Sequence, residues 1–240
     1  MKKHKVLIAI PAFNEEETIA TTLNFCRQEY PYADLLVVND CSTDATLSVI
    51  ISEKVNYLSL PFNLGVGGAM RAAFRYADQN DYSFLIQVDA DGQHNPKDIL
   101  QLLSKSKEFD VVIGSRFLRN DDYPIDIARK FAIQTTRFYL KILTKQNLSD
   151  PTSGFRLSNR RAISLYSYAY PIEYLGDTIG SVVLGSIEGL KFGECPTTML
   201  QRQGGKPSQN KIKSIVHLAR TLLTITMMRL GSSSNTKGAR

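Results

Sequence analysis

Two aspartates one residue apart, Asp89 and Asp91, are the residues of this sequence best suited to chemistry. They follow an apolar run of strand type at 84–88, and Gly92 after them permits a sharp turn. Alternate side chains of an extended chain point the same way, so the two carboxylates can converge on one cation. Two hard oxygen ligands suit Mg²⁺ or Mn²⁺, which share their remaining positions with substrate phosphates and water. The same short motif also occurs in a solvated turn after a strand, so the surrounding residues must distinguish a metal site from such a turn.

The aspartates stand at the end of the fourth of five apolar segments that alternate with helical patterns. The five strands are expected at 6–10, 35–38, 55–60, 84–88 and 111–113. Such alternation is typical of a doubly wound parallel sheet, in which ligands bind outside the carboxyl ends of the strands. Polar or glycine residues follow each segment, so we expect the site at that edge. Asn95 and Pro96 then predict the start of a helix, as N-cap and first helical residue.

The pattern changes in the second half of the chain. Helices are expected at 125–143 and 160–168, a helical or mixed stretch at 170–188, and a strand at 191–200. Residues 209–230 carry an apolar stripe that predicts an amphipathic helix, able to meet a membrane or a partner. The Ser- and Gly-rich residues 231–240 are expected to be disordered.

The basic residues are concentrated at the C-terminal end. Net charge is +6, but residues 195–240 hold eight basic residues and no acidic one, which leaves 21 basic against 23 acidic residues before them. Such asymmetry indicates a polyanionic partner: nucleic acid, a phosphate-bearing substrate or an anionic membrane surface. Three widely spaced cysteines form neither a metal knuckle nor a disulfide framework, which fits a reducing cytosolic setting.

Spacing argues against several common chemistries. Gly65, Gly67 and Gly68 lack the Gly-X-Gly-X-X-Gly spacing of a dinucleotide site, and no Gly-Lys-Ser/Thr of a P-loop occurs. Three separated histidines make zinc improbable, and no Gly-X-Ser-X-Gly elbow is present. The basic tail lacks the interleaved aromatics that stack on nucleic acid. The remaining features are carboxylates and glycines at the edge of the sheet and arginines from the second half of the chain. They suit a metal-bound nucleoside diphosphate whose departure is stabilised by cations.

Six motifs occur in order along the chain. They are PAFNEE at 11–16, VNDCSTD at 38–44, NLGVGGA at 63–69, DADGQHNP at 89–96, GSRF at 114–117 and TSGFR at 152–156. Together they resemble the inverting family 2 glycosyltransferases of GT-A fold, most closely the dolichyl- or polyprenyl-phosphate sugar synthases of the short type without transmembrane helices. The resemblance implies a Rossmann-like α/β three-layer sandwich with a mainly parallel sheet, plus the C-terminal amphipathic helix. The GT-A domain would span 1–208, with a nucleotide-sugar and metal half at about 1–118 and an acceptor half at about 119–208.

The resemblance also implies roles for individual residues. Asp89 and Asp91 would hold the metal with Gln93 as a further ligand, and the catalytic residues would be Asp91, Arg116 and Arg202. The nucleotide-sugar pocket would be formed by Pro11, Asn14, Glu15, Asp40, Gly65, Gly68 and Asp89. The acceptor would be bound by Arg129, Ser153, Arg156, Lys206 and Ser208. Two alternatives stay open. Asn14, Glu15 and Asp40 could simply cap helices, and Arg129 could be a solvated or membrane-facing residue.

The expected reaction is metal-dependent, inverting transfer of a hexose or N-acetylhexosamine from a nucleotide sugar, UDP-linked rather than GDP-linked, to a polyprenyl phosphate. Such a phosphate is already an anion, so it needs cationic contacts and a bilayer surface rather than a strong base. The basic amphipathic segments suit peripheral association with the cytoplasmic face of the cell membrane. A small membrane protein is the expected partner, and a homo-oligomer is an open possibility.

Two other functions stay open. A family 2 enzyme that acts on a hydroxyl of a glycan or lipid-linked saccharide, in cell-surface polysaccharide synthesis, needs a general base, for which Glu173 and Asp177 are candidates. A nucleotide-sugar-binding subunit without turnover would keep the same pocket. A carboxylate that faces the anomeric carbon would favour the enzyme that acts on a hydroxyl. Nucleotide binding without transfer would favour the binding subunit.

Overall fold

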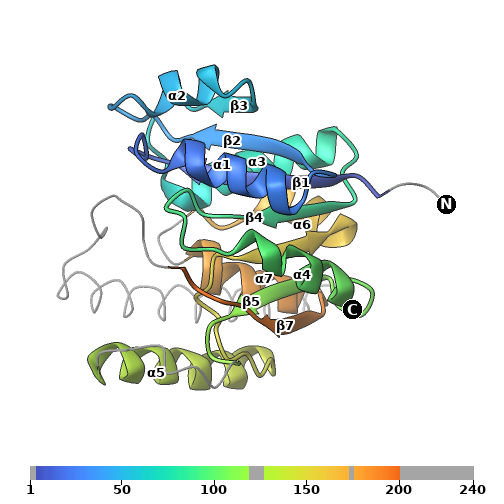
Figure 1. The fold of residues 1–240 in the computed structure, drawn as a ribbon. Helices are drawn as coiled ribbons and strands as arrows, with labels where there is room; N and C mark the ends of the chain where they lie inside the picture. The colour runs from blue at the N-terminus through green and yellow to red at the C-terminus, as the bar shows by residue number, and fades with distance from the viewer. Residues whose placement is uncertain (1–3, 119–126, 173–175, 201–240) are drawn as a thin grey trace.

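The computed structural model describes residues 4–118, 127–172 and 176–200 (Figure 1). These residues form a seven-stranded sheet with the order β3-β2-β1-β4-β6-β5-β7. The strands are β1 (Val6–Ala12), β2 (Asp34–Asn39), β3 (Asn56–Ser59), β4 (Phe84–Gln87), β5 (Val111–Ser115), β6 (Arg156–Asn159) and β7 (Phe192–Pro196). Neighbouring strands are parallel except at β6, which runs antiparallel to β4 and β5. The predicted mainly parallel α/β sheet is therefore confirmed.

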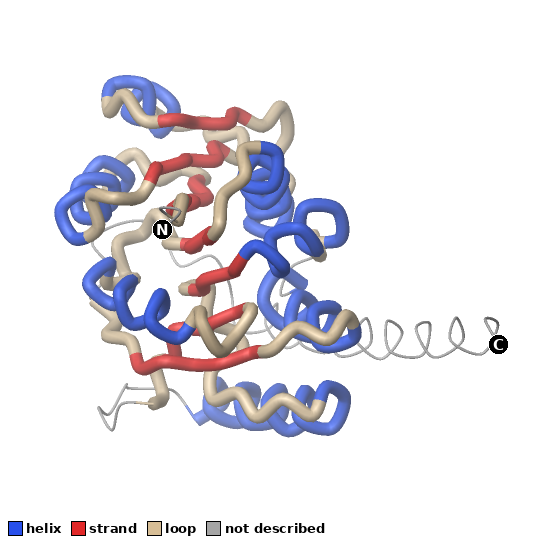
Figure 2. The backbone as a smooth tube through the Cα atoms, turned by 90° about the vertical axis from the view of Figure 1, so that its right-hand side faces the viewer, coloured by secondary structure: helices blue, strands red, loops and turns tan. Residues whose placement is uncertain are grey.

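Helices cover both faces of the sheet, which gives three layers (Figure 2). The face that carries Leu7 and Ala9 packs against α3, α6 and α7, and the face that carries Ile8 and Ile10 packs against α1, α2 and α4. Consecutive residues of β1 thus lie in opposite core clusters, as a strand buried on both sides requires. The helices are α1 (Ile19–Glu29), α2 (Thr46–Ser52), α3 (Gly65–Gln79), α4 (Ile99–Lys105), α5 (Ile127–Thr144), α6 (Arg160–Ala169) and α7 (Ser181–Ile187), with the short turns η1 (Pro96–Asp98) and η2 (Gly176–Gly180).

The sequence does not predict β6. Of its four residues only Leu157 is strongly apolar, yet Arg156 and Ser158 are buried as well. Backbone carbonyls accept the hydrogen bonds of the Arg156 guanidinium, which makes its burial tolerable. Because β6 lies between β4 and β5, the second half of the chain is part of the same sheet as the first.

The helix α3 begins at Gly65, so the glycines at 65, 67 and 68 form its first turn. A Cβ on Gly67 would come within 2.9 Å of backbone atoms of Pro171 and Ile172. Glycine therefore lets the first turn of α3 approach the backbone that leads into η2.

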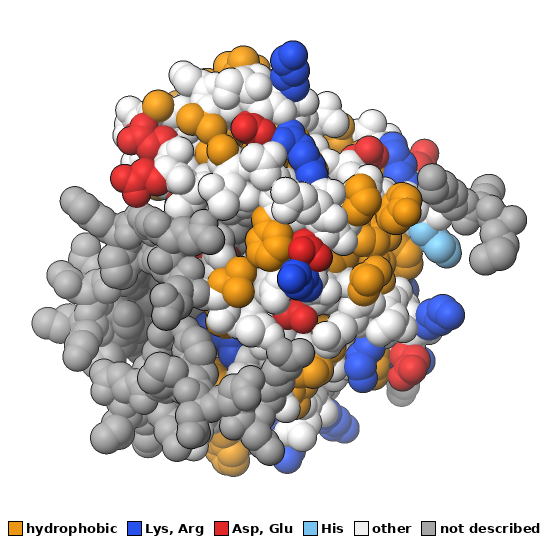
Figure 3. Space-filling model, viewed as in Figure 1, with side chains coloured by type: hydrophobic (Ala, Val, Ile, Leu, Met, Phe, Trp, Pro, Cys, Tyr) orange, Lys and Arg blue, Asp and Glu red, His pale blue; other side chains and the backbone are white. Residues whose placement is uncertain are grey.

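The predicted helix at 125–143 corresponds to α5, whereas the predicted helix at 209–230 and the tail at 231–240 lie outside the described residues. None of the described helices is long and apolar enough to cross a bilayer. On the face seen in Figure 3, Lys and Arg side chains are interspersed with Asp and Glu side chains over the described part of the chain.

Candidate active site

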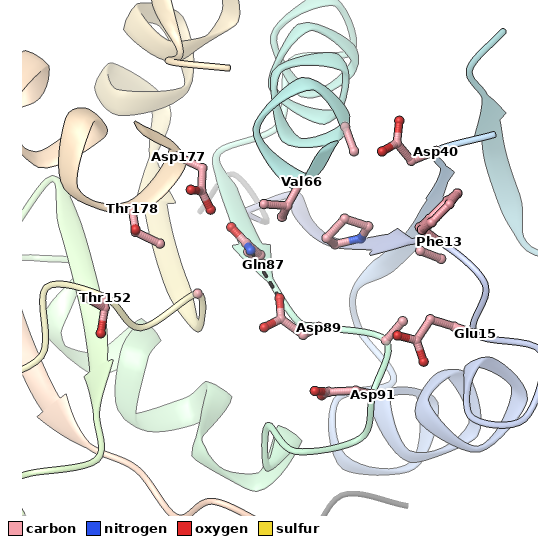
Figure 4. A pocket seen from close by; sticks show the side chains of 15 residues that line it. Phe13, Glu15, Asp40, Val66, Gln87, Asp89, Asp91, Thr152, Asp177 and Thr178 are labelled. Atoms are coloured by element: carbon pink, nitrogen blue, oxygen red, sulfur yellow. Dashed lines mark hydrogen bonds between the residues drawn. The ribbon is translucent and has the colours of Figure 1, made fainter. Parts of the chain in front are cut away.

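A cavity of about 310 Å³ opens at the carboxyl ends of β1, β2 and β4. Small-molecule sites usually measure roughly 300–1,000 Å³, so this one is at the lower end of the range. Figure 4 shows acidic side chains from the strand ends opposite residues of the turn at 152–154 and of η2. The lining consists of Pro11, Ala12, Phe13, Glu15, Asp40, Val66, Ala69, Gln87, Asp89, Ala90, Asp91, Thr152, Gly154, Asp177 and Thr178. This strongly acidic lining suits a cation together with an anionic ligand.

The ends of β1 and β2 bring three predicted donor-site residues together: Pro11, Glu15 and Asp40 all line the cavity. Asp40 is 3% exposed, and its Oδ1 accepts a hydrogen bond of 2.8 Å from the Leu64 N–H at the start of α3. The buried carboxylate thus fixes the helix that forms one wall, and it remains part of the lining.

Three other predicted donor-site residues, Asn14, Gly65 and Gly68, lie outside the lining. The Asn14 Oδ1 accepts a hydrogen bond of 2.8 Å from the Thr43 N–H, so this side chain joins the loop after β1 to the loop after β2. The two glycines belong to the first turn of α3, whose Val66 reaches the cavity instead.

The loop after β4, residues 88–95 (the metal loop), turns the carboxylates of Asp89 and Asp91 into one open space (Figure 4). Gly92 has a φ of +71°, the left-handed conformation that its turn requires. The Asp91 Oδ1 accepts a hydrogen bond of 3.0 Å from the Gln93 N–H. Gln93 is not part of the lining, and its carbonyl accepts a hydrogen bond from the Leu200 N–H at 2.9 Å.

The two carboxylates fit a divalent cation that takes part of its coordination from a ligand. Both are hard oxygen donors on one wall of the cavity. Within the described residues, no group of three or more His, Cys, Asp or Glu side chains is arranged to hold a metal ion by itself. Mg²⁺ is commonly bound by one or two carboxylates, with substrate phosphates and water in its remaining positions.

Gln87 is a lining residue that spacing alone identifies. It precedes Asp89 by two positions, so both side chains point the same way, and its Nε2 donates to the Asp89 Oδ1 at 3.2 Å. The signal is a polar residue inside an apolar strand. Gly154 carries no such signal: a Cβ there would lie 3.1 Å from both the Asp89 Oδ2 and the Gln87 Nε2. The missing side chain keeps the space beside Asp89 open.

Asp177 stands in the wall opposite the strand ends. Burial raises the pKa of its carboxyl group to about 6; the positive charge of Arg156 opposes this rise, and the negative charge of Asp89 adds to it. A carboxyl group with such a pKa can exchange a proton near neutral pH. Glu173, the other candidate base, lies outside the described residues.

Arg116, which we expected to be catalytic, and Arg156, which we expected to bind the acceptor, do not line the cavity. The Arg116 guanidinium forms a bidentate pair with Asp150, with Nε 2.6 Å from Oδ2 and Nη2 2.7 Å from Oδ1. Arg156 is 6% exposed and donates to two carbonyls of the turn at 151–153 and to one in η2. Both arginines thus brace the segments that carry the lining residues Thr152 and Asp177.

The predicted acceptor residues are only partly described. The Ser153 Oγ accepts a hydrogen bond from the Phe155 N–H at 3.3 Å, and Ser153 does not line the cavity. The side chain of Arg129 and the residues Arg202, Lys206 and Ser208 lie outside the described part of the chain. Their roles stay predictions.

Comparison with known proteins agrees with this architecture. The family described as Glycosyl transferase family 2 matches residues 7–166. An undecaprenyl-phosphate mannosyltransferase from Micrococcus luteus is 32% identical over 197 residues, which cover 79% of this chain and 74% of that protein. A polyprenol monophosphomannose synthase from Mycolicibacterium smegmatis is 26% identical over 217 residues, which cover 84% of this chain and 79% of that protein.

A solved structure shows the same fold. Glucosyl-3-phosphoglycerate synthase from Mycobacterium tuberculosis, in complex with Mn²⁺, UDP and phosphoglyceric acid, matches with a TM-score of 0.71. The match covers 95% of this chain and 79% of that one at 17% identity, so the likeness concerns the fold alone. Sheet topology and the match to the family over two thirds of the chain lead to one conclusion. The chain belongs to glycosyltransferase family 2 and is a glycosyltransferase of GT-A-like fold.

Proposed function

We propose that this enzyme transfers a hexose or N-acetylhexosamine, with inversion, from a UDP-linked sugar to a polyprenyl phosphate at the cytoplasmic face of the membrane. The observation that carries the proposal is the presence of Asp89 and Asp91 in one cavity with the buried Asp40. The names of the two relatives, an undecaprenyl-phosphate mannosyltransferase and a polyprenol monophosphomannose synthase, support the acceptor class.

The proposed transfer is a single displacement. The acceptor oxygen forms a bond to the anomeric carbon while the bond from that carbon to the diphosphate breaks, and the electron pair leaves with the nucleoside diphosphate. Asp89 and Asp91 would hold Mg²⁺ or Mn²⁺ against this diphosphate, and the ion supplies neutralisation of the charge that develops there. Asp40 would accept a hydrogen bond from the base or ribose at the other end of the donor.

The exposed face of α5 supports an acceptor at a membrane surface. Phe138 and Ile142 lie one helical turn apart and are 68% and 60% exposed, and Arg137 and Lys141 are exposed beside them. Apolar and basic side chains in such proximity are typical of helices that lie in the interfacial plane of an anionic membrane. A polyprenyl phosphate presents its headgroup at the same level.

A transfer assay with purified protein tests the proposal. Radiolabelled UDP-sugars and GDP-sugars are incubated with Mg²⁺ or Mn²⁺ and with undecaprenyl phosphate in detergent. Undecaprenol is the matched acceptor, because it has the same chain and a hydroxyl in place of the phosphate. Labelled lipid is expected from the phosphate acceptor and a UDP-sugar. Transfer of label to undecaprenol but not to undecaprenyl phosphate would overturn the proposed acceptor. The absence of labelled lipid with every donor would also overturn it.

Asp177 favours a second candidate function, which is transfer to a hydroxyl of a glycan or lipid-linked saccharide. A hydroxyl acceptor loses its proton as it attacks, so such an enzyme needs a general base in the cavity. Asp177 lines that cavity, and its pKa of about 6 leaves it ionised at pH 7.5. A phosphate acceptor makes no use of this property.

Asp177→Asn separates the two functions. Transfer to undecaprenyl phosphate is expected to continue in this variant, because an ionised phosphate needs no base. Transfer to a hydroxyl would fall about 10²–10⁴-fold, the usual contribution of a general base. The measurement is kcat at pH 7.5 with each acceptor. A loss of that size with the phosphate acceptor would contradict the proposed function and favour the second candidate.

The same variant is expected to melt at a higher temperature than the parent at pH 7.5 and at nearly the same temperature below pH 4. The pKa of Asp177 is about 6 in the folded protein, against 3.8 ordinarily, because burial disfavours the carboxylate. Its ionisation therefore destabilises the fold above pH 6, and this destabilisation disappears as the pH falls from 6 to below 3.8. Melting curves across this range are the measurement. A difference in melting temperature between parent and variant that is the same at every pH would contradict the raised pKa of Asp177.

A further inference from the structure

His94 belongs to the metal loop, but its side chain lies outside the cavity. Its side chain is 5% exposed and is not part of the lining. The ring Nδ1 accepts a hydrogen bond of 3.0 Å from the Asp89 N–H, and the ring Nε2 lies 3.5 Å from the Asp89 Oδ2. One side chain thus contacts Asp89 at its backbone and at its carboxylate.

The contact to the backbone meets a need created by the end of β4. The Val88 N–H still donates to the Ala9 carbonyl at 3.0 Å, which continues the pairing of β1 with β4. The Asp89 N–H lies beyond this pairing in a partly buried position, where a donor without a partner is costly. The His94 ring supplies the partner, so the path of the chain through Asp89 depends on it.

The ring is fixed from two sides. It packs against the ring of Phe155, with the centroids 5.1 Å apart and the planes at 31°. His94 also pairs with Met199 in an isolated β-bridge, and the next residue, Leu200, donates its N–H to the Gln93 carbonyl. These contacts leave the imidazole little freedom to turn away from Asp89.

This ring orientation sets what faces the carboxylate. A nitrogen that accepts a hydrogen bond carries no proton, so the N–H of the ring is on Nε2, the nitrogen near the Asp89 Oδ2. On the other side, the Gln87 Nε2 donates to the Asp89 Oδ1. Each carboxylate oxygen therefore has a neighbour that restrains it, and both restraints come from residues of β4 or the metal loop.

We propose that His94 is a positioning residue that holds the Asp89 carboxylate in the orientation that binds the divalent cation. The inference rests on the proposed function, because it requires Asp89 to be a metal ligand. Partners behind a metal ligand typically change metal affinity about 10–100-fold when they are removed. When only the Nε2 contact is lost, the decrease in metal affinity is expected to be at the lower end of that range.

The test compares two substitutions of His94 that each keep one of its contacts. In His94→Asn, the amide oxygen takes the place of Nδ1 and keeps an acceptor for the Asp89 N–H, but the Nε2 position is empty. In His94→Gln, the amide reaches the Nε2 position and the Nδ1 acceptor is lost. Leu102→Ala is the control for general destabilisation, because it removes core packing in α4 and leaves His94 and Asp89 in place.

Mn²⁺ affinity is measured from the EPR signal of the free ion, with and without UDP. UDP affinity without metal and the melting temperature are measured in parallel. His94→Asn is expected to weaken Mn²⁺ binding about tenfold and to keep the metal-free UDP affinity of the parent. Leu102→Ala is expected to lower the melting temperature and to keep the Mn²⁺ affinity.

The outcomes distinguish this inference from the proposed function. Parent-like Mn²⁺ affinity in His94→Asn would overturn the role of His94 and leave the proposed function intact. An equal loss in His94→Asn and Leu102→Ala would also overturn it, because the loss would then follow general stability. Absence of Mn²⁺ binding in the parent protein, with and without UDP, would overturn the metal site itself and the role of His94 with it.

Discussion

Asp91→Asn is expected to lower kcat for sugar transfer about 10²–10³-fold, the usual loss when one group that stabilises developing charge is removed. The substitution takes one of the two negative charges of the metal loop away from the cavity. It preserves the shape of the loop, because the asparagine Oδ1 can still accept the hydrogen bond that Asp91 accepts from the Gln93 N–H. The measurement is kcat at saturating donor with Mn²⁺, together with the Mn²⁺ affinity.

Asp44→Asn is the matched control for this experiment. Asp44 also follows a strand end, but it does not line the cavity, and its Oδ1 accepts a hydrogen bond from the Thr46 N–H at the start of α2. We expect this variant to keep the kcat of the parent. A comparable loss in Asp44→Asn, or parent-like transfer by Asp91→Asn, would contradict a metal site formed by the metal loop.

The location of the cavity at the ends of the strands could be predicted because it depends on short-range patterns. The alternation of apolar strands and helices predicts which edge of the sheet carries the polar loops. The period of two in an extended chain predicts that Asp89 and Asp91 point the same way, and Gln87 follows the same rule. Each of these inferences needs only a few adjacent residues, so the sequence contains all that they require.

β6, and the place and raised pKa of Asp177, could not be predicted in this way, because contacts distant in sequence decide them. Arg156 is buried in a strand because carbonyls before it in the turn and after it in η2 accept its hydrogen bonds. Asp177 has a raised pKa because η2 buries it in the wall that faces Asp89. In the sequence it was one of two candidate bases, with Glu173 beside it.

Arg116 illustrates the same limit and leads to a prediction on stability. Asp150→Asn is expected to lower the free energy of unfolding by about 3–5 kcal/mol, because it removes the carboxylate of a buried ion pair. The Asp150 side chain is fully buried and that of Arg116 is 11% exposed. Urea denaturation with a two-state fit measures the change, and a value below about 1 kcal/mol, typical of a surface pair, would contradict it.

A double substitution tests whether Arg116 braces the turn or contacts the donor. Arg116→Met with Asp150→Leu removes both charges of this ion pair, so it is expected to be more stable than Asp150→Asn. If Arg116 only holds the turn that carries Thr152, transfer should recover in the double variant as stability recovers. If Arg116 also contacts the departing diphosphate, transfer should stay low in a protein that is stable again. Because only the second outcome separates activity from stability, measurement of both in the same preparation assigns the arginine to one role.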